Sequence, residues 1–419
     1  MNPGSQPRFI PALDGLRGIA IILVMLHHFT YYRPESGIDA HIGSVLLFFW
    51  TRVDLFFVLS GFLITGILLD TRGSERYFRT FYARRTLRIF PLYYLVLFIA
   101  FIVLPPFPTA NALLIGQEGQ VTLPPQWPYW LYLTNFSIAE GGWAHGWVDV
   151  AWSLAIEEQF YLVWPLLIWL CPPRLVVPLC IVILASQPLA RVYARETDVA
   201  ALSIFVLPWF RLDGFAIGAL LAVAQRRGLL PALDRWVPLV VIVSAAGLVA
   251  FTILGGHTWW WNRWNQQYGY TLIAITGGAM LVSAIARPAD SFWPRFLSAG
   301  WMRAFGKYSY GLYLIHAPVM RVVREYVFDP LDYERFGLTP WVAQMLYYAA
   351  ATAPSFALAW LSWRFFEAPI LGLKKWFPYS GARDSSPLPP RDEELSGFAS
   401  GDADTDDFTP YRRKSSNPR

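Results

Sequence analysis

The stretch LDGLRGIAIILVMLHHFTYY, residues 13–32, decides the class of fold. It opens with charged residues and continues as an apolar block long enough for a membrane-spanning helix, which needs about 20 mostly apolar residues. Similar blocks recur, with cores near residues 17–32, 53–69, 88–104, 152–170, 175–190, 204–224, 236–254, 269–286, 308–328 and 341–363. The sequence therefore predicts an all-α integral membrane protein, a bundle of about ten transmembrane helices.

The composition excludes an ordinary soluble fold. Of the 419 residues, 55% are hydrophobic and only 15% are charged, whereas soluble proteins have about 25% charged residues. The two cysteines, Cys171 and Cys180, match no disulfide or metal-binding spacing, so no metal site is predicted. The formal charge of +5 lies mainly in short connections between apolar blocks, which indicates a membrane protein and not a nucleic-acid partner.

The distribution of Arg and Lys predicts the topology. They gather in alternate connections, and residues 89–171 contain none. The positive-inside rule then puts both termini in the cytoplasm. Residues 1–377 form the predicted membrane domain, and the Ser-, Pro-, Asp- and Gly-rich residues 378–419 a disordered cytoplasmic tail. No small-residue cleavage site follows the first block, so we expect it to stay as a helix and not to be a signal peptide.

Ionisable residues inside membrane segments are functional candidates by default. Arg17 and His28 are eleven residues apart, so they share a helix face about 16 Å apart along the axis. This spacing predicts a cation at the cytoplasmic mouth and an imidazole deeper in the bilayer, both lining one path. The alternative is an arginine at the lipid headgroups and a histidine that only bonds neighbouring helices.

Two further features carry charge into the bundle. Arg85 and Arg88 share one helix face, and their planar guanidinium groups suit phosphate oxygens; the alternative is topogenic charge or lipid headgroup binding. Ser153, Glu157 and Tyr161 recur every four residues on another helix, where a carboxylate can act as acid, base or partner of a histidine. We interpret Asp54, Asp213, His316 and Glu367 as packing or interhelical hydrogen-bonding groups.

These segments together resemble the integral membrane acyltransferase family 3, which includes bacterial O-antigen and exopolysaccharide O-acetyltransferases. The matching stretches are Leu13 through Arg17 with His28 after ten further residues, Val53 through Phe62, Arg85-Thr-Leu-Arg88, Trp152 through Tyr161, Arg211-Leu-Asp213, Gly218 through Ala222, Tyr308 through His316, and Glu367-Ala-Pro369. They run in order from about residue 9 to residue 370.

The resemblance implies transfer of an acyl group, most simply acetyl, from cytoplasmic acyl-CoA to a hydroxyl beyond the membrane. It implies catalytic roles for His28, Glu157 and Asp14, and donor binding by Arg17, Arg85 and Arg88. Acyl-CoA is then a substrate, and no permanently bound cofactor is expected. Histidine suits the role of base for the incoming hydroxyl, and Glu157 is expected to fix the tautomer of that histidine. His27 is expected to pack, and Glu158 is not predicted to belong to the site.

The acceptor is expected to be a glycan or a glycosylated molecule, modified at the inner membrane. Trp143 and Trp147 lie in a predicted outside loop, and indole faces stack on sugar rings; the alternative is an interfacial aromatic belt. Some members of the resembled family append a soluble hydrolase-like domain. In this sequence the predicted bundle is followed by the acidic and then basic tail, so we expect transfer to be completed inside the bundle or with a separate partner.

Two rival functions stay open. The first is a transporter of a lipid-linked sugar or acyl group, with Arg17, His28 and Glu157 as a proton relay; it needs no CoA thioester. The second is a membrane scaffold without catalysis, which tolerates replacement of His28. The sequence also leaves open the acyl group, the oligomeric state, and the choice between direct transfer and a transient acyl-histidine.

Overall fold

The computed structural model describes residues 10–32, 48–107 and 125–379, together with residues 43, 46 and 109. The predicted tail lies outside these residues apart from Pro378 and Tyr379, so its disorder stays a prediction. Within the described parts of the chain there are helices and no strand. The all-α prediction is therefore confirmed.

The helices fall into long and short groups. The long ones are α1 (Pro11–Phe29), α3 (Arg52–Thr71), α4 (Tyr77–Phe98), α8 (Ala151–Leu170), α9 (Val176–Glu196), α11 (Asp213–Arg226), α13 (Val237–Gly255), α14 (Tyr270–Ala286), α16 (Gly300–Tyr326) and α17 (Pro340–Ser362). The short ones are α6 (Trp127–Trp130), α7 (Thr134–Gly141), α10 (Ala201–Val206), α12 (Leu230–Asp234), α15 (Phe292–Leu297) and α18 (Ala368–Gly372). Single π-helical segments extend α4, precede α14 and follow α17, at Ile99–Val103, Asn265–Gly269 and Trp363–Glu367.

Six helical segments are long and apolar enough to cross a membrane, judged by length and composition within the described residues. They are Pro11–Phe29, Phe49–Thr71, Tyr77–Val103, Pro173–Glu196, Val237–Gly255 and Asn265–Ala286. These segments support a multi-pass membrane protein. Helices α8, α16 and α17 match three other predicted blocks in position. The count of about ten spans and the cytoplasmic termini stay predictions.

The predicted helix over residues 204–224 is broken in the structure. Helix α10 ends at Val206, Leu207 is extended with φ −85° and ψ 139°, and α11 begins only at Asp213. Pro208 explains the break, because a residue before proline avoids the α conformation and proline has no N–H for the helix ladder. The prediction of one continuous helix was therefore wrong at this point.

Two residues at the break, Arg211 and Asp213, form buried ion pairs with other helices. Arg211 contacts Asp54 of α3 at 2.9 Å, and Asp213 contacts Arg191 of α9 at 2.9 Å. Asp213 also accepts a hydrogen bond from Thr271 of α14 at 2.5 Å. Asp54 and Asp213 therefore join helices, as the sequence indicated.

Glycines allow the closest helix contacts. A Cβ at Gly18 of α1 would lie 2.2 Å from the backbone oxygen of Met302 on α16, and one at Gly218 of α11 would lie 2.1 Å from that of Val58 on α3. No larger residue fits at these distances. Small residues at such contacts let membrane helices pack by direct backbone approach, so these glycines fix the pairs α1–α16 and α3–α11.

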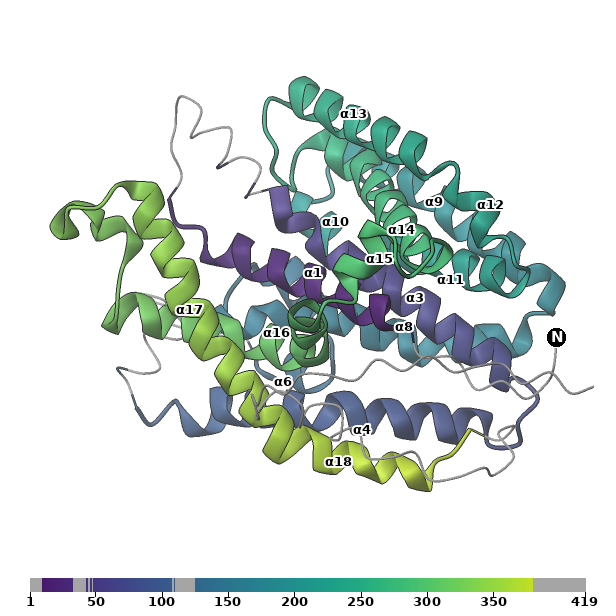
Figure 1. Cartoon of the computed structure of the whole chain (residues 1–419), viewed down its shortest axis with the longest axis horizontal. Helices are drawn as coiled ribbons and strands as arrows, with labels where there is room; N and C mark the ends of the chain where they lie inside the picture. Colours follow the sequence, from purple (N-terminus) through teal and green to yellow (C-terminus); the bar gives the residue numbers. More distant parts are fainter. Residues whose placement is uncertain are drawn as a thin grey trace, which may run out of the picture. The chain divides into compact units, whose positions relative to one another are not determined.

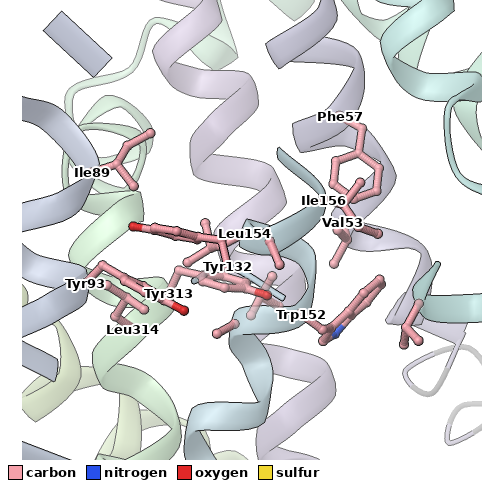
Figure 2. Close-up of a cluster of buried hydrophobic side chains, with 14 of the residues drawn as sticks. Val53, Phe57, Ile89, Tyr93, Tyr132, Trp152, Leu154, Ile156, Tyr313 and Leu314 are labelled. Carbon is pink, nitrogen blue, oxygen red and sulfur yellow. The ribbon is translucent and has the colours of Figure 1, made fainter. Parts of the chain in front are cut away.

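The largest buried apolar cluster lies between α3, α4, α8 and α16. Figure 2 shows part of it, where Tyr93 of α4 and Tyr132 stack with ring centroids 4.3 Å apart and Tyr313 of α16 lies in the same cluster. Aromatic rings fill large volumes with few rotatable bonds. The cluster therefore holds these helices, and the polar residues on them, in fixed relative positions.

Helix α13 differs from these central helices. It packs against α14 and α12 at the upper edge of Figure 1, and exposes Leu239, Val241, Ile242, Val243, Val249, Ile253 and Leu254. A helix that is apolar all round and also exposed is suited to lipid contact. This face supports the membrane assignment independently of the polar residues.

Candidate active site

Five helices surround one polar cavity. It has a volume of about 90 Å³, and its walls come from α1, α3, α4, α8 and α16. The polar lining residues are Arg17, Ser60, Arg85, Arg88, Ser153, Glu157, Tyr161, Ser309, Tyr310 and Tyr313. The structure thus brings together four sequence-predicted site residues from three separate motifs, namely Arg17, Arg85, Arg88 and Glu157.

The arginines give the cavity an excess of positive charge. Arg85 lies over the ring of Tyr161, with its guanidinium carbon 5.0 Å from the ring centroid. Within the described chain, no carboxylate lies within ion-pair distance of Arg85 or Arg88. Arg17 forms an ion pair with Asp14 at 3.5 Å. Cations left without a close carboxylate in a cavity favour an anionic ligand.

Glu157 belongs to a small hydrogen-bonded group on the cavity wall. Its carboxylate accepts hydrogen bonds from Ser60 of α3 at 3.3 Å and from Tyr161, one turn along α8, at 2.9 Å. The hydroxyls of Ser60 and Tyr161 are 2.8 Å apart. The helical spacing of Glu157 and Tyr161 was visible in the sequence, but the partner on α3 was not.

His28 lies outside the cavity lining and has its own buried partners. Its Nδ1 is 2.6 Å from Nε2 of His316 on α16, and its Nε2 is 2.6 Å from Nη2 of Arg52 on α3. His316 is fully buried and Arg52 nearly so. Arg17 and His28 were expected to line one open path; the structure instead separates them into a cavity and a buried histidine pair.

Tyr313 links the two groups. It lines the cavity, its hydroxyl is 2.6 Å from that of Ser153, and it donates to the carbonyl of Val150 at 2.7 Å. On its other side, the ring centroids of Tyr313 and His316 are 6.0 Å apart. The chain of contacts therefore runs from the arginine-lined cavity through Tyr313 and His316 to His28.

One expected role needs correction. Glu157 was expected to fix the tautomer of His28, but its carboxylate bonds to Ser60 and Tyr161, whereas His28 bonds to His316 and Arg52. Asp14 lies one turn from Arg17 at the start of α1 and forms an ion pair with it. Fourteen residues of helix, about 21 Å, separate Asp14 from His28, and the catalytic role of Asp14 stays a prediction.

The two tryptophans proposed for acceptor binding differ in exposure. Trp143 is 47% exposed, whereas Trp147 is 5% exposed and belongs to the same buried cluster as Val96, Leu97 and Leu314. A buried indole has no free face for a sugar ring. The expectation for Trp147 was therefore wrong, and only Trp143 keeps its predicted role.

Sequence reasoning missed Arg52 and understated His316. Arg52 directly precedes the predicted core 53–69 and lies within the apolar helical segment Phe49–Thr71, where the rule that intramembrane charges are functional candidates applies to it. His316 was interpreted as an interhelical hydrogen-bonding group, which is correct, but nothing in the sequence indicated that its partner is His28. Their proximity depends on how α1, α3 and α16 pack.

The fold and the site define a class of protein: a multi-pass helical membrane protein with a cationic cavity and a buried histidine pair. The comparison with family models is specific, because the model described as an acyltransferase domain matches residues 10–364. The chain therefore belongs to the integral membrane acyltransferase family 3.

Curated relatives support this membership. The chain is 27% identical over 373 residues to the peptidoglycan O-acetyltransferase OatA of Listeria monocytogenes, covering 87% of this chain and 56% of the relative. It is 29% identical to the O-acetyltransferase OatA of Staphylococcus aureus, covering 87% of this chain and 58% of the relative. It is also 29% identical to the putative peptidoglycan O-acetyltransferase YrhL of Bacillus subtilis, covering 75% of this chain and 49% of the relative.

The chain thus spans about half the length of the curated relatives it matches. No solved structure matches it.

Proposed function

We propose that this protein transfers an acetyl group from acetyl-CoA, on the cytoplasmic side of the inner membrane, to a hydroxyl of a cell-envelope glycan. The observation that carries the proposal is the convergence of Arg17, Arg85 and Arg88 on one cavity, two of them without a close carboxylate in the described chain. Acyl-CoA carries several phosphate charges on a slender pantetheine arm. The guanidinium groups suit its phosphates.

In the proposed reaction, His28 carries the proton of the acceptor hydroxyl. The acceptor oxygen attacks the thioester carbon, the new C–O bond forms, and the C–S bond breaks. His28 takes the hydroxyl proton and then gives it to the departing CoA sulfur, so that CoA leaves as the thiol. Its position, joined through His316 and Tyr313 to the cavity, supports this role.

The acceptor class follows from the relatives. Two of the three relatives described above are named for O-acetylation of peptidoglycan, so peptidoglycan is the first acceptor to test. Trp143, half-exposed in the connection before α8, offers an indole face for a sugar ring.

The test uses purified protein in liposomes with labelled acetyl-CoA and peptidoglycan fragments. His28→Ala is expected to stay folded and bind acetyl-CoA but to transfer acetyl at most about a hundredth as fast, because a general base contributes about 10² to 10⁴ in rate. His27→Ala is the matched control, since the adjacent side chain points about 100° away on the helix, and it should keep most of the activity.

Three results would overturn the proposal. Near-parental turnover of His28→Ala, or loss of turnover only in His27→Ala, would show that His28 is not the general base. Glycan movement without release of CoA thiol would favour the transporter.

A further inference from the structure

The buried histidine pair fixes the position of a proton. Nδ1 of His316 is 2.9 Å from the carbonyl oxygen of Leu312, one turn earlier on α16. A carbonyl oxygen only accepts, so Nδ1 of His316 carries a proton. In the neutral ring Nε2 of His316 then has the lone pair, and it accepts from whatever faces it.

His28 faces that lone pair. Its Nδ1 lies 2.6 Å from Nε2 of His316, and the two ring planes are 8° apart. A hydrogen bond at this distance needs a proton on Nδ1 of His28, because Nε2 of His316 has none to give. This leaves Nε2 of His28 as the basic nitrogen.

Arg52 supports the same assignment independently. Its Nη2 is 2.6 Å from Nε2 of His28, while its Nη1 donates to the carbonyl of Phe49 at 3.1 Å. A guanidinium has donors and no acceptor, so Nε2 of His28 must be the acceptor. Two neighbours on different helices, α16 and α3, therefore select one tautomer of the same ring.

We propose that His316 is a positioning residue that holds a proton on Nδ1 of His28 and so makes Nε2 the nitrogen that takes the acceptor's proton. The proposal rests on the proposed function, since it deepens the role of His28. Arg52 occupies Nε2 in this structure, so the acceptor hydroxyl takes its place there before transfer. The order of contacts is then Leu312 carbonyl, His316, His28 and acceptor.

The first test measures the tautomer in the unaltered protein. Nitrogen-15 NMR of histidine-labelled protein in detergent distinguishes protonated from bare ring nitrogens. The chain has six histidines, and the signal that is lost in His28→Gln identifies His28. The expected spectrum has the proton of His28 on Nδ1 and a bare Nε2. A protonated Nε2, in a neutral or a charged ring, overturns the proposal.

The second test separates positioning from packing. His316→Phe keeps a ring of similar size but removes the acceptor, and it should lower kcat at least about tenfold with the KM for acetyl-CoA unchanged, as for lost partners that orient a histidine. His316→Gln restores an acceptor oxygen near the position of Nε2 and should recover most of the lost kcat. His257→Phe, at a histidine in the connection between α13 and α14, is the matched control and should keep the parental kcat.

The outcomes distinguish this proposal from the proposed function. If His28→Ala is inactive while His316→Phe keeps the parental kcat, the positioning role is wrong and the base assignment stands. If His316→Gln is as inactive as a folded His316→Phe, packing explains the loss and the positioning role is also wrong. If His28→Ala keeps parental turnover, the base assignment fails and with it the statement that Nε2 takes the acceptor's proton, and the NMR spectrum then tests only the proton position on Nδ1.

Discussion

Arginines lie in two polar regions of this molecule whose surroundings differ. At the junction of α3, α9, α11 and α14, Arg191 and Arg211 are fully buried and each contacts an aspartate at 2.9 Å. In the cavity between α1, α4 and α8, Arg85 and Arg88 are partly exposed, and no carboxylate of the described chain lies within ion-pair distance.

Under the proposed function, the difference separates structural from ligand-binding charge. A buried pair repays its desolvation only when its geometry is good, and the aspartates provide that geometry. Arg85 and Arg88 have no such partner in the described chain, so the proposed function has an incoming anion supply the missing charge. Each of these two roles predicts a different response to mutation.

The largest expected effect is at the paired region. Arg211→Gln leaves the carboxylate of Asp54 buried without its partner, which costs about 3–5 kcal/mol of stability. We expect a large drop in melting temperature or loss of the monodisperse peak in size-exclusion chromatography. The double variant Asp54→Asn, Arg211→Gln removes both charges and should melt closer to the parent. Parental melting of the single variant would show that this pair is not structural.

The cavity arginines should respond through binding and not through stability. Arg85→Ala, Arg88→Ala is expected to stay folded but bind acetyl-CoA at least about tenfold more weakly, because charged hydrogen bonds contribute about 1.5–3 kcal/mol each. Lysine at both positions should bind with intermediate affinity, since it keeps the charge and loses the bidentate geometry.

Isothermal titration calorimetry measures the acetyl-CoA affinity of these variants, and Arg84→Ala is the control. Arg84 donates to the carbonyls of Lys374 and Phe377, so its loss should leave acetyl-CoA affinity unchanged. If the double alanine variant binds as tightly as the parent, the cavity arginines are topogenic or lipid-binding residues.

The next prediction concerns Glu157, the acidic residue that lines the cavity. Glu157→Gln removes a charge from the cavity wall but keeps an acceptor for Ser60 and Tyr161. We expect kcat to fall about tenfold, with acetyl-CoA affinity equal or higher because a like charge has gone. Glu158→Gln, one residue along α8, should change kcat less. Equal kcat in both variants and the parent would remove Glu157 from the site.

The smallest expected effect is at Trp143. Trp143→Ala should raise the acceptor KM about threefold, consistent with the loss of one partly exposed aromatic contact, with acetyl-CoA affinity and melting temperature unchanged. Acetyl transfer at varied peptidoglycan-fragment concentration measures the KM. A lowered melting temperature with an unchanged KM would instead place Trp143 in an interfacial aromatic belt.

Much of the fold was readable because membrane helices have strong local signatures. A run of apolar residues must satisfy its backbone within the helix in lipid, so α1, α3, α8 and α13 appear close to their predicted positions. The break before α11 was missed even though Pro208 marks it, because the apolar run continues across the proline. Hydrophobicity therefore predicted which segments form long apolar helices better than where those helices end.

The sequence by itself determined the helical membrane class, the family and the cationic motifs, because apolar length and residue spacing within one helix are local properties. Only the tertiary structure decided which motifs meet: it brought Arg17, Arg85, Arg88 and Glu157 to one cavity. It also placed His316 and Arg52 against His28, and buried Trp147. These contacts join residues up to 288 positions apart, and they depend on close helix packing at glycines such as Gly18 and Gly218, which no periodicity within a single helix encodes.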